Sequence, residues 1–227
     1  IIPIPGRRTT VKTRIVAHGQ QVIRLDQETD SDISDVEEEL VLASLAELMP
    51  TADIVVVSDY AKGLLTKRIL RQLIAMARES GKSIVVDPKG RDYSKYDGAS
   101  LLTPNRREAA DAAGMDINTV DLVSLAGSKL LADRSVDALL VTQGEEGMTL
   151  FESNSEPFHL KALAREVYDV TGAGDTVIAT FAVASAAGAD RREAAKLANI
   201  AARIVVGQIG TTSITVEELK TALQERA

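Results

Sequence analysis

One glycine-rich segment combines an anion-binding turn with a candidate general base. Residues 169–175 read Asp-Val-Thr-Gly-Ala-Gly-Asp, and an apolar helical stretch follows them. Small residues at a helix start let unpaired backbone N–H groups approach an anion, and the helix dipole adds favourable potential there. Asp175 could accept a proton from a hydroxyl group that attacks a phosphoryl group held by those N–H groups. The competing interpretation is a glycine-rich turn whose aspartate merely suits a helix start.

Four further candidate positions directly follow predicted strands. Ligands of a parallel sheet bind beyond the carboxyl ends of its strands, so residues that directly follow strands are candidates for ligand binding or catalysis. These positions are Asp59, Asp87, Asn105 and Gly144.

Two of these positions belong to patterns that also have a purely structural interpretation. Residues 105–108 read Asn-Arg-Arg-Glu, which is a capping box when it begins a helix. Residues 142–147 read Thr-Gln-Gly-Glu-Glu-Gly, which also suits a hairpin turn into the apolar stretch 148–151. Neither pattern alone decides between a structural and a chemical role.

Alternating strands and helices must position these residues. Apolar runs predict strands at 54–57, 83–86, 100–102 and 138–141, and the β-branched run at 54–57 is typical of a buried parallel strand. Helical spacing and stop signals predict helices at 35–49, 66–80, 106–113, 122–132, 174–187, 191–206 and 216–224. This alternation predicts an α/β fold with a mostly parallel sheet covered by helices on both faces.

A two-stranded hairpin is predicted outside that sheet. Residues 11–17 and 20–26 alternate apolar and polar side chains around His18-Gly19. We expect residues 1–28 to form a lid-type β-hairpin segment and residues 29–227 to form the α/β core. Because exposed edge strands invite pairing, we also expect a homodimer that forms through the lid.

Composition narrows the classes of function. The 227 residues are 45% hydrophobic and 26% charged, which suits one substantial core. A net charge of −7 argues against a surface for nucleic acid or anionic membrane. The absence of cysteine excludes thiolate chemistry and is compatible with the cytoplasm, where we expect the protein. The chain begins without Met or a signal pattern, so we expect an upstream segment to be missing.

Together these patterns resemble the ribokinase-like (PfkB) family of carbohydrate kinases. Residues 169–175 are similar to the family signature Asp-Thr-x-Gly-Ala-Gly-Asp, residues 105–108 to Asn-x-x-Glu, and residues 142–147 to Thr-x-Gly-x-x-Gly. The resemblance implies that Asp175 is the catalytic base and that Gly172, Ala173 and Gly174 form an anion hole.

The resemblance also implies ATP and Mg²⁺ as cofactors, with a monovalent cation as a further candidate. It assigns Glu108 to the metal. The residues implied to bind the nucleotide and its phosphates are Asn105, Glu108, Thr142, Gly144, Gly147 and Asn199.

A finer resemblance concerns the kinases of D-glycero-D-manno-heptose 7-phosphate in ADP-heptose and lipopolysaccharide core synthesis. It rests on residues 13–17, 20–26, 58–63, 87–90, 102–105 and 166–169. It implies transfer of a phosphoryl group from ATP to the anomeric hydroxyl of that sugar. A phosphorylated sugar needs cations and hydrogen-bonding groups. By position, the candidates are Lys89, Lys62, Arg14 and Gln20, of which the last three can equally be solvated surface groups. We expect Asp59 either to hold sugar hydroxyls or to shape the cleft.

Two alternatives stay open at this point. One is another kinase of the same family that acts on a different sugar or nucleoside. The other is a non-catalytic nucleotide-binding fragment, because the glycine pair and early Asn or Asp residues with which the family grasps its sugar have no match here.

Overall fold

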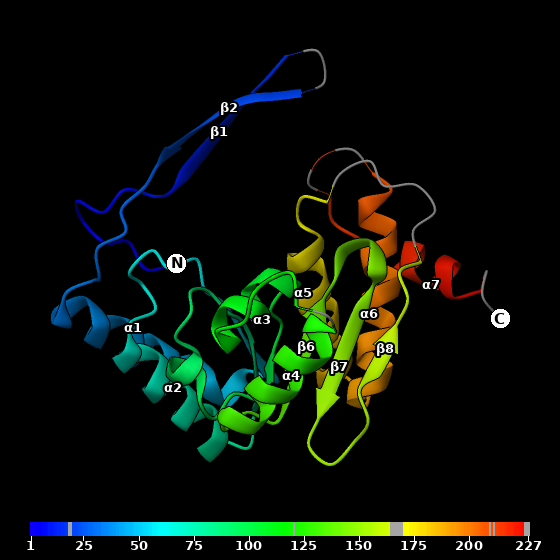
Figure 1. Ribbon diagram of the computed structural model, residues 1–227. Helices are drawn as coiled ribbons and strands as arrows, with labels where there is room; N and C mark the ends of the chain where they lie inside the picture. The colour runs from blue at the N-terminus through cyan, green and yellow to red at the C-terminus, as the bar shows by residue number, and fades with distance from the viewer. Residues whose placement is uncertain (18–19, 120, 164–169, 209, 211, 225–227) are drawn as a thin grey trace.

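A six-stranded sheet forms the centre of the computed structural model (Figure 1). The structure describes the chain except for residues 18–19, 120, 164–169, 209, 211 and 225–227, and the side chains of Gln20 and Gln21. The strand order is β3-β4-β5-β6-β7-β8. Their bounds are Ile54–Ser58, Ser83–Asp87, Leu101–Leu102, Ala138–Thr142, Met148–Glu152 and Phe158–Leu160. Strands β3 to β6 run parallel, whereas β7 and β8 are antiparallel to their neighbours.

Helices cover both faces of this sheet, as the alternation predicts. Helices α2 (Lys67–Glu79), α3 (Arg106–Ala113) and α4 (Leu122–Asp133) pack on one face, and α5 (Ala173–Ala186) and α6 (Arg191–Val206) on the other. Helix α1 (Asp35–Leu48) packs against α2, and α7 (Val216–Gln224) packs against α6. Short 3₁₀ turns lie at Met49–Thr51 (η1), Tyr93–Tyr96 (η2) and Gly144–Glu146 (η3).

The central strands are apolar throughout because both of their faces are buried. Val86 and Leu102 face the α2–α4 layer, whereas Val85 and Leu101 face the α5–α6 layer. This alternation follows from the two-residue repeat of a strand, and burial on both sides explains why the sequence shows continuous runs there.

Side-chain caps set the helix starts at the predicted places. The side chains of Thr66, Asn105 and Asp190 accept hydrogen bonds from the backbone N–H groups three residues further on, at 3.2, 2.9 and 2.8 Å. Such caps satisfy donors that a helix start otherwise leaves unpaired. The predicted bounds of these helices are therefore confirmed to within a residue or two.

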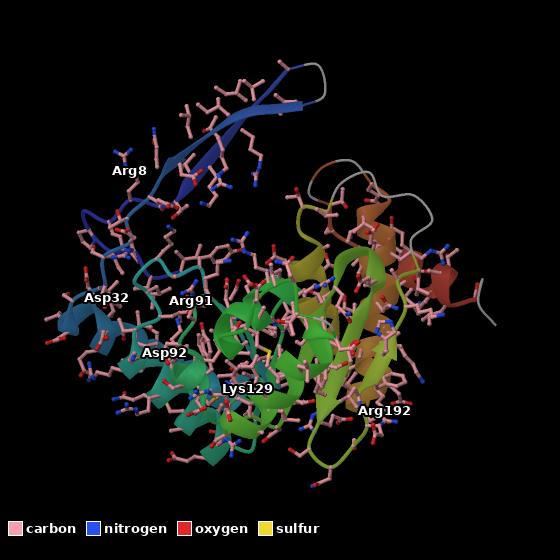
Figure 2. The ribbon with its side chains drawn as sticks, viewed as in Figure 1. Arg8, Asp32, Arg91, Asp92, Lys129 and Arg192 are labelled. Atoms are coloured by element: carbon pink, nitrogen blue, oxygen red, sulfur yellow. The ribbon has the colours of Figure 1, made fainter. Side chains whose placement is uncertain are left out.

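The hairpin is a separate two-stranded sheet that projects from the core (Figure 1). Strand β1 (Val11–Ala17) pairs antiparallel with β2 (Gln20–Gln27), and Ile15 lies opposite Ile23. Its side chains reach into open space on both sides (Figure 2). The chain before it belongs with the core, since Ile2 and Ile4 pack against the cluster between α1 and α2. The division at residue 28 stays a prediction.

Residues 54–57 form the predicted parallel strand, but the prediction that it is buried is wrong in part. Among the described strands, β3 lies at the edge of the six-stranded sheet, where Val56 is 46% exposed and Val57 is buried. Strand β8 was not predicted, since its three residues form a strand only through pairing with β7. Among the described residues, no helix is long and apolar enough to cross a membrane.

Candidate active site

The glycine-rich turn leads directly into α5, and Asp175 lies in its first turn. Gly172 caps this helix in the left-handed conformation, with φ of 82°, and no side chain caps it. The N–H of Ala173 donates to the Val170 carbonyl at 3.2 Å. The N–H groups of Gly174 and Asp175 have no acceptor among the described residues, so these two amides are the open donors of the turn.

The Asp175 carboxylate is exposed and forms no ion pair within the described part of the chain. It lies near the half-buried Asp87 at the end of β4. Burial, followed by the negative charges of Glu108 and Asp175, raises the pKa of Asp87 to about 7. Carboxylates from β4, α3 and α5 therefore gather at the carboxyl edge of the sheet, where ligands of such sheets bind.

Asn105 and Glu108 form the capping box that begins α3. The Asn105 side chain accepts from the Glu108 N–H at 2.9 Å, and the Asn105 N–H donates to Glu108 Oε2 at 3.0 Å. Glu108 Oε1 accepts from Lys89 Nζ at 2.7 Å. This contact raises the pKa of Lys89. The structural interpretation of the Asn-x-x-Glu pattern thus holds. The same arrangement leaves the Glu108 carboxylate near Asp87, at the carboxyl edge of the sheet.

The segment 142–147 is a hairpin turn between β6 and β7, as its structural interpretation predicts. Gly144 and Gly147 adopt φ of 62° and 98°, which side chains rarely tolerate. A side chain at Gly147 would also collide with the Leu160 carbonyl, whereas the space beside Gly144 is open. Thr142 forms a parallel bridge with Asn105, so two patterns that are far apart in the sequence meet here.

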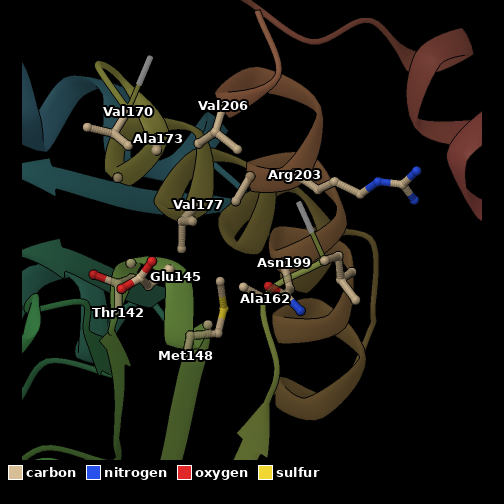
Figure 3. A pocket seen from close by; sticks show the side chains of 15 residues that line it. Thr142, Glu145, Met148, Ala162, Val170, Ala173, Val177, Asn199, Arg203 and Val206 are labelled. Atoms are coloured by element: carbon tan, nitrogen blue, oxygen red, sulfur yellow. The ribbon is translucent and has the colours of Figure 1, made fainter. Parts of the chain in front are cut away.

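A cavity of about 430 Å³ joins this hairpin turn to the glycine-rich turn (Figure 3). The hairpin turn and β7 form one wall, and α5 and α6 form the other. Six of the residues predicted for nucleotide or phosphate binding line it: Thr142, Gly144, Gly147, Ala173, Gly174 and Asn199. Asn199 is buried, and its Nδ2 donates to the Lys161 carbonyl at 2.9 Å, which fixes the chain after β8 against α6.

Apart from Glu145 and Arg203, the other residues that line this cavity are apolar, which sequence reasoning did not find. Met148, Val177 and Val206 point into it from β7, α5 and α6 (Figure 3). An apolar slot beside open backbone donors suits a planar base with phosphates at one end. Its signal in the sequence is weak, because the helical positions that line the slot look like ordinary core positions.

Asp59, at the end of β3, is buried and already hydrogen-bonded on both oxygens. Oδ1 accepts from the Ala61 N–H at 2.7 Å, and Oδ2 accepts from Lys95 Nζ at 2.6 Å and the Tyr96 hydroxyl at 2.5 Å. These contacts hold the loop 59–63, in which Ala61 has a φ of 51°. The observed contacts thus give Asp59 a role in shaping the loop.

Asp59 and Lys62 line a second cavity, of about 440 Å³, at the base of the hairpin. Lys62 Nζ contacts Glu28 Oε1 at 2.5 Å. The other predicted sugar-binding residues lie elsewhere: Lys89 contacts Glu108, and Arg14 is exposed on β1 opposite Arg24. Gln20 begins β2, but its side chain lies outside the described part of the chain.

The site suits a metal that is held mainly by its substrate. Within the described residues, no group of three or more acidic or histidine side chains converges closely enough to enclose a metal ion. Mg²⁺ commonly binds through one or two carboxylates, water and substrate phosphates. Glu108 fits this pattern, since the mutual repulsion that raises the pKa of Asp87 is relieved by a cation.

Comparisons of sequence identify the family of this chain. The model of the pfkB family carbohydrate kinases matches residues 1–218. The chain is 43% identical over 221 residues to the bifunctional protein HldE of Desulfatibacillum aliphaticivorans and 47% identical over 215 residues to that of Geotalea uraniireducens (strain Rf4). These matches cover 97% and 95% of this chain but only 45% and 44% of the relatives, so it spans less than half of their length.

Comparisons of structure give the same fold. Phosphofructokinase-2 from Escherichia coli in complex with potassium matches with a TM-score of 0.81 at 19% identity, over 96% of this chain and 71% of that one. Arabidopsis thaliana ribokinase complexed with ribose and ATP matches with a TM-score of 0.68 at 24% identity, over 91% and 65%. The predicted ribokinase-like α/β fold is confirmed. With its fold, its signature segments and the family match in agreement, this chain belongs to the pfkB family of carbohydrate kinases.

Proposed function

We propose that this protein is an ATP-dependent kinase that phosphorylates the anomeric hydroxyl of D-glycero-D-manno-heptose 7-phosphate. The product is the 1,7-bisphosphate of ADP-heptose and lipopolysaccharide core synthesis. The observation that carries the kinase assignment is the exposed Asp175 carboxylate, beside two open N–H groups and next to Gly174, which lines the cavity between the hairpin turn and helices α5 and α6. The choice of sugar is supported by the resemblance described above and by the two HldE relatives.

The nucleotide occupies the cavity between the hairpin turn 142–147 and helices α5 and α6. Its base lies in the apolar slot near Val177, and its phosphates extend toward Gly174. The open N–H groups of Gly174 and Asp175 then stabilise the charge that develops on the transferred group. Their position at the start of α5 adds the favourable potential of the helix dipole.

The acceptor enters from the side of the hairpin, where Asp59 and Lys62 line the second cavity. Asp175 accepts the proton of the anomeric hydroxyl while its oxygen attacks the terminal phosphorus of ATP in line. The P–O bond to ADP breaks as the bond to the sugar oxygen forms, so no covalent enzyme intermediate is needed. The Asp175 carboxylate suits this role because it has no ion-pair partner among the described residues.

Magnesium supplies charge neutralisation at the ATP phosphates when it is bound. Glu108 is the residue that would hold it, directly or through water. Lys89, which contacts Glu108, is then better placed to orient that carboxylate or the nucleotide phosphates than to grasp the sugar. A monovalent cation remains a further candidate, since the phosphofructokinase-2 match was solved with potassium.

We also propose that two copies of this chain pair through their hairpins. One face of the hairpin carries Val11, Ile15, Ile23 and Leu25, each about half exposed. Pairing of two such faces would remove this apolar surface from water, which stabilises association. We further propose a cytoplasmic location, because an ATP-dependent kinase needs a compartment that supplies ATP.

A phosphoryl-transfer assay with labelled ATP tests the proposed function. The purified protein is incubated with heptose 7-phosphate, fructose 6-phosphate, ribose or adenosine, and the labelled products are separated. We expect the highest kcat/KM for heptose 7-phosphate. A higher value for another acceptor would replace the substrate, and ATP binding without transfer to any acceptor would contradict the kinase assignment.

A further inference from the structure

Two lysines from separate parts of the chain line the cavity at the base of the hairpin. Lys12 comes from β1, and Lys62 comes from the loop that follows β3. Asp59 lines the same cavity, but its charge is balanced by Lys95, whose Nζ lies 2.6 Å away. The two lysines are therefore the cations available to a ligand there.

Glu28 joins these two lysines. Its Oε2 lies 3.1 Å from Lys12 Nζ, and its Oε1 lies 2.5 Å from Lys62 Nζ. All three side chains are half-buried, with 29%, 31% and 22% of the side chain exposed for Lys12, Lys62 and Glu28. The contacts with Lys62 and Lys12 lower the pKa of Glu28, which keeps it ionised. One carboxylate thus spans two cations at the cavity wall.

We propose that Lys12 and Lys62 form the subsite for the phosphate group of the acceptor sugar, and that Glu28 occupies this subsite until the sugar arrives. This inference rests on the proposed function. A phosphate group carries about −1.5 to −2 charges at neutral pH and offers three acceptor oxygens, compared with one charge and two oxygens for Glu28. It therefore displaces the carboxylate from both ammonium groups.

Charge around the subsite agrees with this exchange. Lys12 also contacts Asp26 at 3.1 Å, and Asp26 is held by Arg24 at 2.9 Å. Displacement of Glu28 leaves two cationic side chains, Lys12 and Lys62, at the cavity wall, while Asp59 is balanced by Lys95 and Asp26 by Arg24. The cavity then has a net positive charge, which suits an anionic group and gives an unphosphorylated sugar no comparable advantage.

A simpler interpretation is that the three side chains only fasten the hairpin to the core. The two interpretations predict opposite effects of Glu28→Gln. If Glu28 competes with the phosphate group, its replacement leaves the two lysines free, and the sugar phosphate binds more tightly. If Glu28 only fastens the hairpin to the core, its replacement loosens the wall of the cavity, and the sugar phosphate binds more weakly.

Calorimetric titration of the purified protein with heptose 7-phosphate and with the unphosphorylated heptose separates these outcomes. We expect Glu28→Gln to tighten binding of the sugar phosphate about three- to fivefold, as an ion pair of this exposure implies. We expect Lys12→Gln and Lys62→Gln each to weaken it about tenfold or more, with little effect on the unphosphorylated sugar. Lys12→Arg should keep most of the affinity.

Lys129→Gln, on α4 and away from the hairpin (Figure 2), is the matched control and should bind like the wild type. Thermal unfolding confirms that each variant is folded. Weaker binding by Glu28→Gln, or equal losses for both sugars in the lysine variants, would overturn the subsite while leaving the kinase assignment intact. A wild-type protein that binds ATP but not heptose 7-phosphate would instead overturn the proposed substrate and, with it, the subsite.

Discussion

Asp175, in the first turn of α5, lies close enough to Asp87, at the end of β4, for the two carboxylates to repel each other. These two residues are 88 positions apart in the sequence. Their proximity shows that the start of α5 lies at the carboxyl edge of the sheet, beside the end of β4. A carboxylate that is turned into the core could not serve as the proposed base.

The raised pKa of Asp87 predicts that stability falls as the pH rises. Because its folded-state pKa is about 7, above the ordinary value, the folded protein binds the proton more tightly than the unfolded chain does. Stability is therefore greatest below about pH 4 for this group and is lost as the pH rises through about 7. We expect Asp87→Asn to flatten this profile and to stabilise the metal-free protein at pH 8 by about 1 to 2 kcal/mol, a value discounted for partial exposure.

Urea unfolding at several pH values measures this effect. Asp92→Asn is the control, because a contact with Lys67 lowers the pKa of Asp92 to about 2, so its contribution changes only under acidic conditions. An Asp87→Asn profile parallel to that of the wild type between pH 5 and 8 would contradict the prediction.

Asp59 should matter for stability more than an exposed acid does. Asp59→Ala leaves the half-buried Lys95 ammonium and the buried Tyr96 hydroxyl without their carboxylate partner. Loss of one member of a buried pair costs about 3 to 5 kcal/mol. Asp133→Ala, which removes the partner of Lys129 in an exposed pair, should cost less than about 1 kcal/mol. Equal free energies of unfolding for the two variants would refute this role of Asp59.

Gly144 and Gly81 form a matched pair for testing the nucleotide cavity. Their φ angles are 62° and 65°, and an added side-chain carbon meets no atom within 4 Å at either position. Each substitution by alanine should lower the free energy of unfolding by about 1 to 2 kcal/mol, the strain of the left-handed conformation. Only Gly144→Ala should raise the KM for ATP, since its methyl group lies at the cavity wall. Similar KM values for both variants would argue against a nucleotide there.

Pairing through the hairpin predicts that a charge on its apolar face separates the protomers. Ile15 and Ile23 lie opposite each other and are 47% and 48% exposed. Ile15→Lys should convert a dimer into a monomer in light scattering, because the charge would have to be buried. Val183→Lys, at a 70% exposed position on α5, should leave the assembly unchanged. A monomeric wild-type protein, or a dimeric Ile15→Lys variant, would contradict the pairing.

Much of the fold is predictable because its signals are local. The caps at Asn105 and Asp190 lie within three residues of the groups that they satisfy, so the helix bounds can be read from neighbouring residues. The edge position of β3 is not local. A run of β-branched residues predicts a strand, but nothing within the run says whether another strand lies beyond it.

The site also combines features with local sequence signals and features that depend on the folded chain. The glycine-rich turn and the hairpin turn are continuous segments with recognisable patterns, whereas the contact between Lys62 and Glu28 joins residues 34 positions apart. The hydrogen bonds that Asp59 Oδ2 accepts likewise come from Lys95 and Tyr96 in η2, more than 30 positions away in the sequence. Such contacts arise only when the chain has folded, so the position of Asp59 after a strand could not decide between binding the sugar and shaping the cleft.

The most direct test of the central claim is the turnover of Asp175→Asn with ATP and heptose 7-phosphate. A general base contributes about 10²- to 10⁴-fold to the rate, so kcat should fall by that factor while the Kd for ATP stays within about twofold of the wild type. Asp133→Asn, an exposed acid on α4, should retain normal kinetics. Wild-type turnover by Asp175→Asn would contradict the assignment of Asp175 as the base.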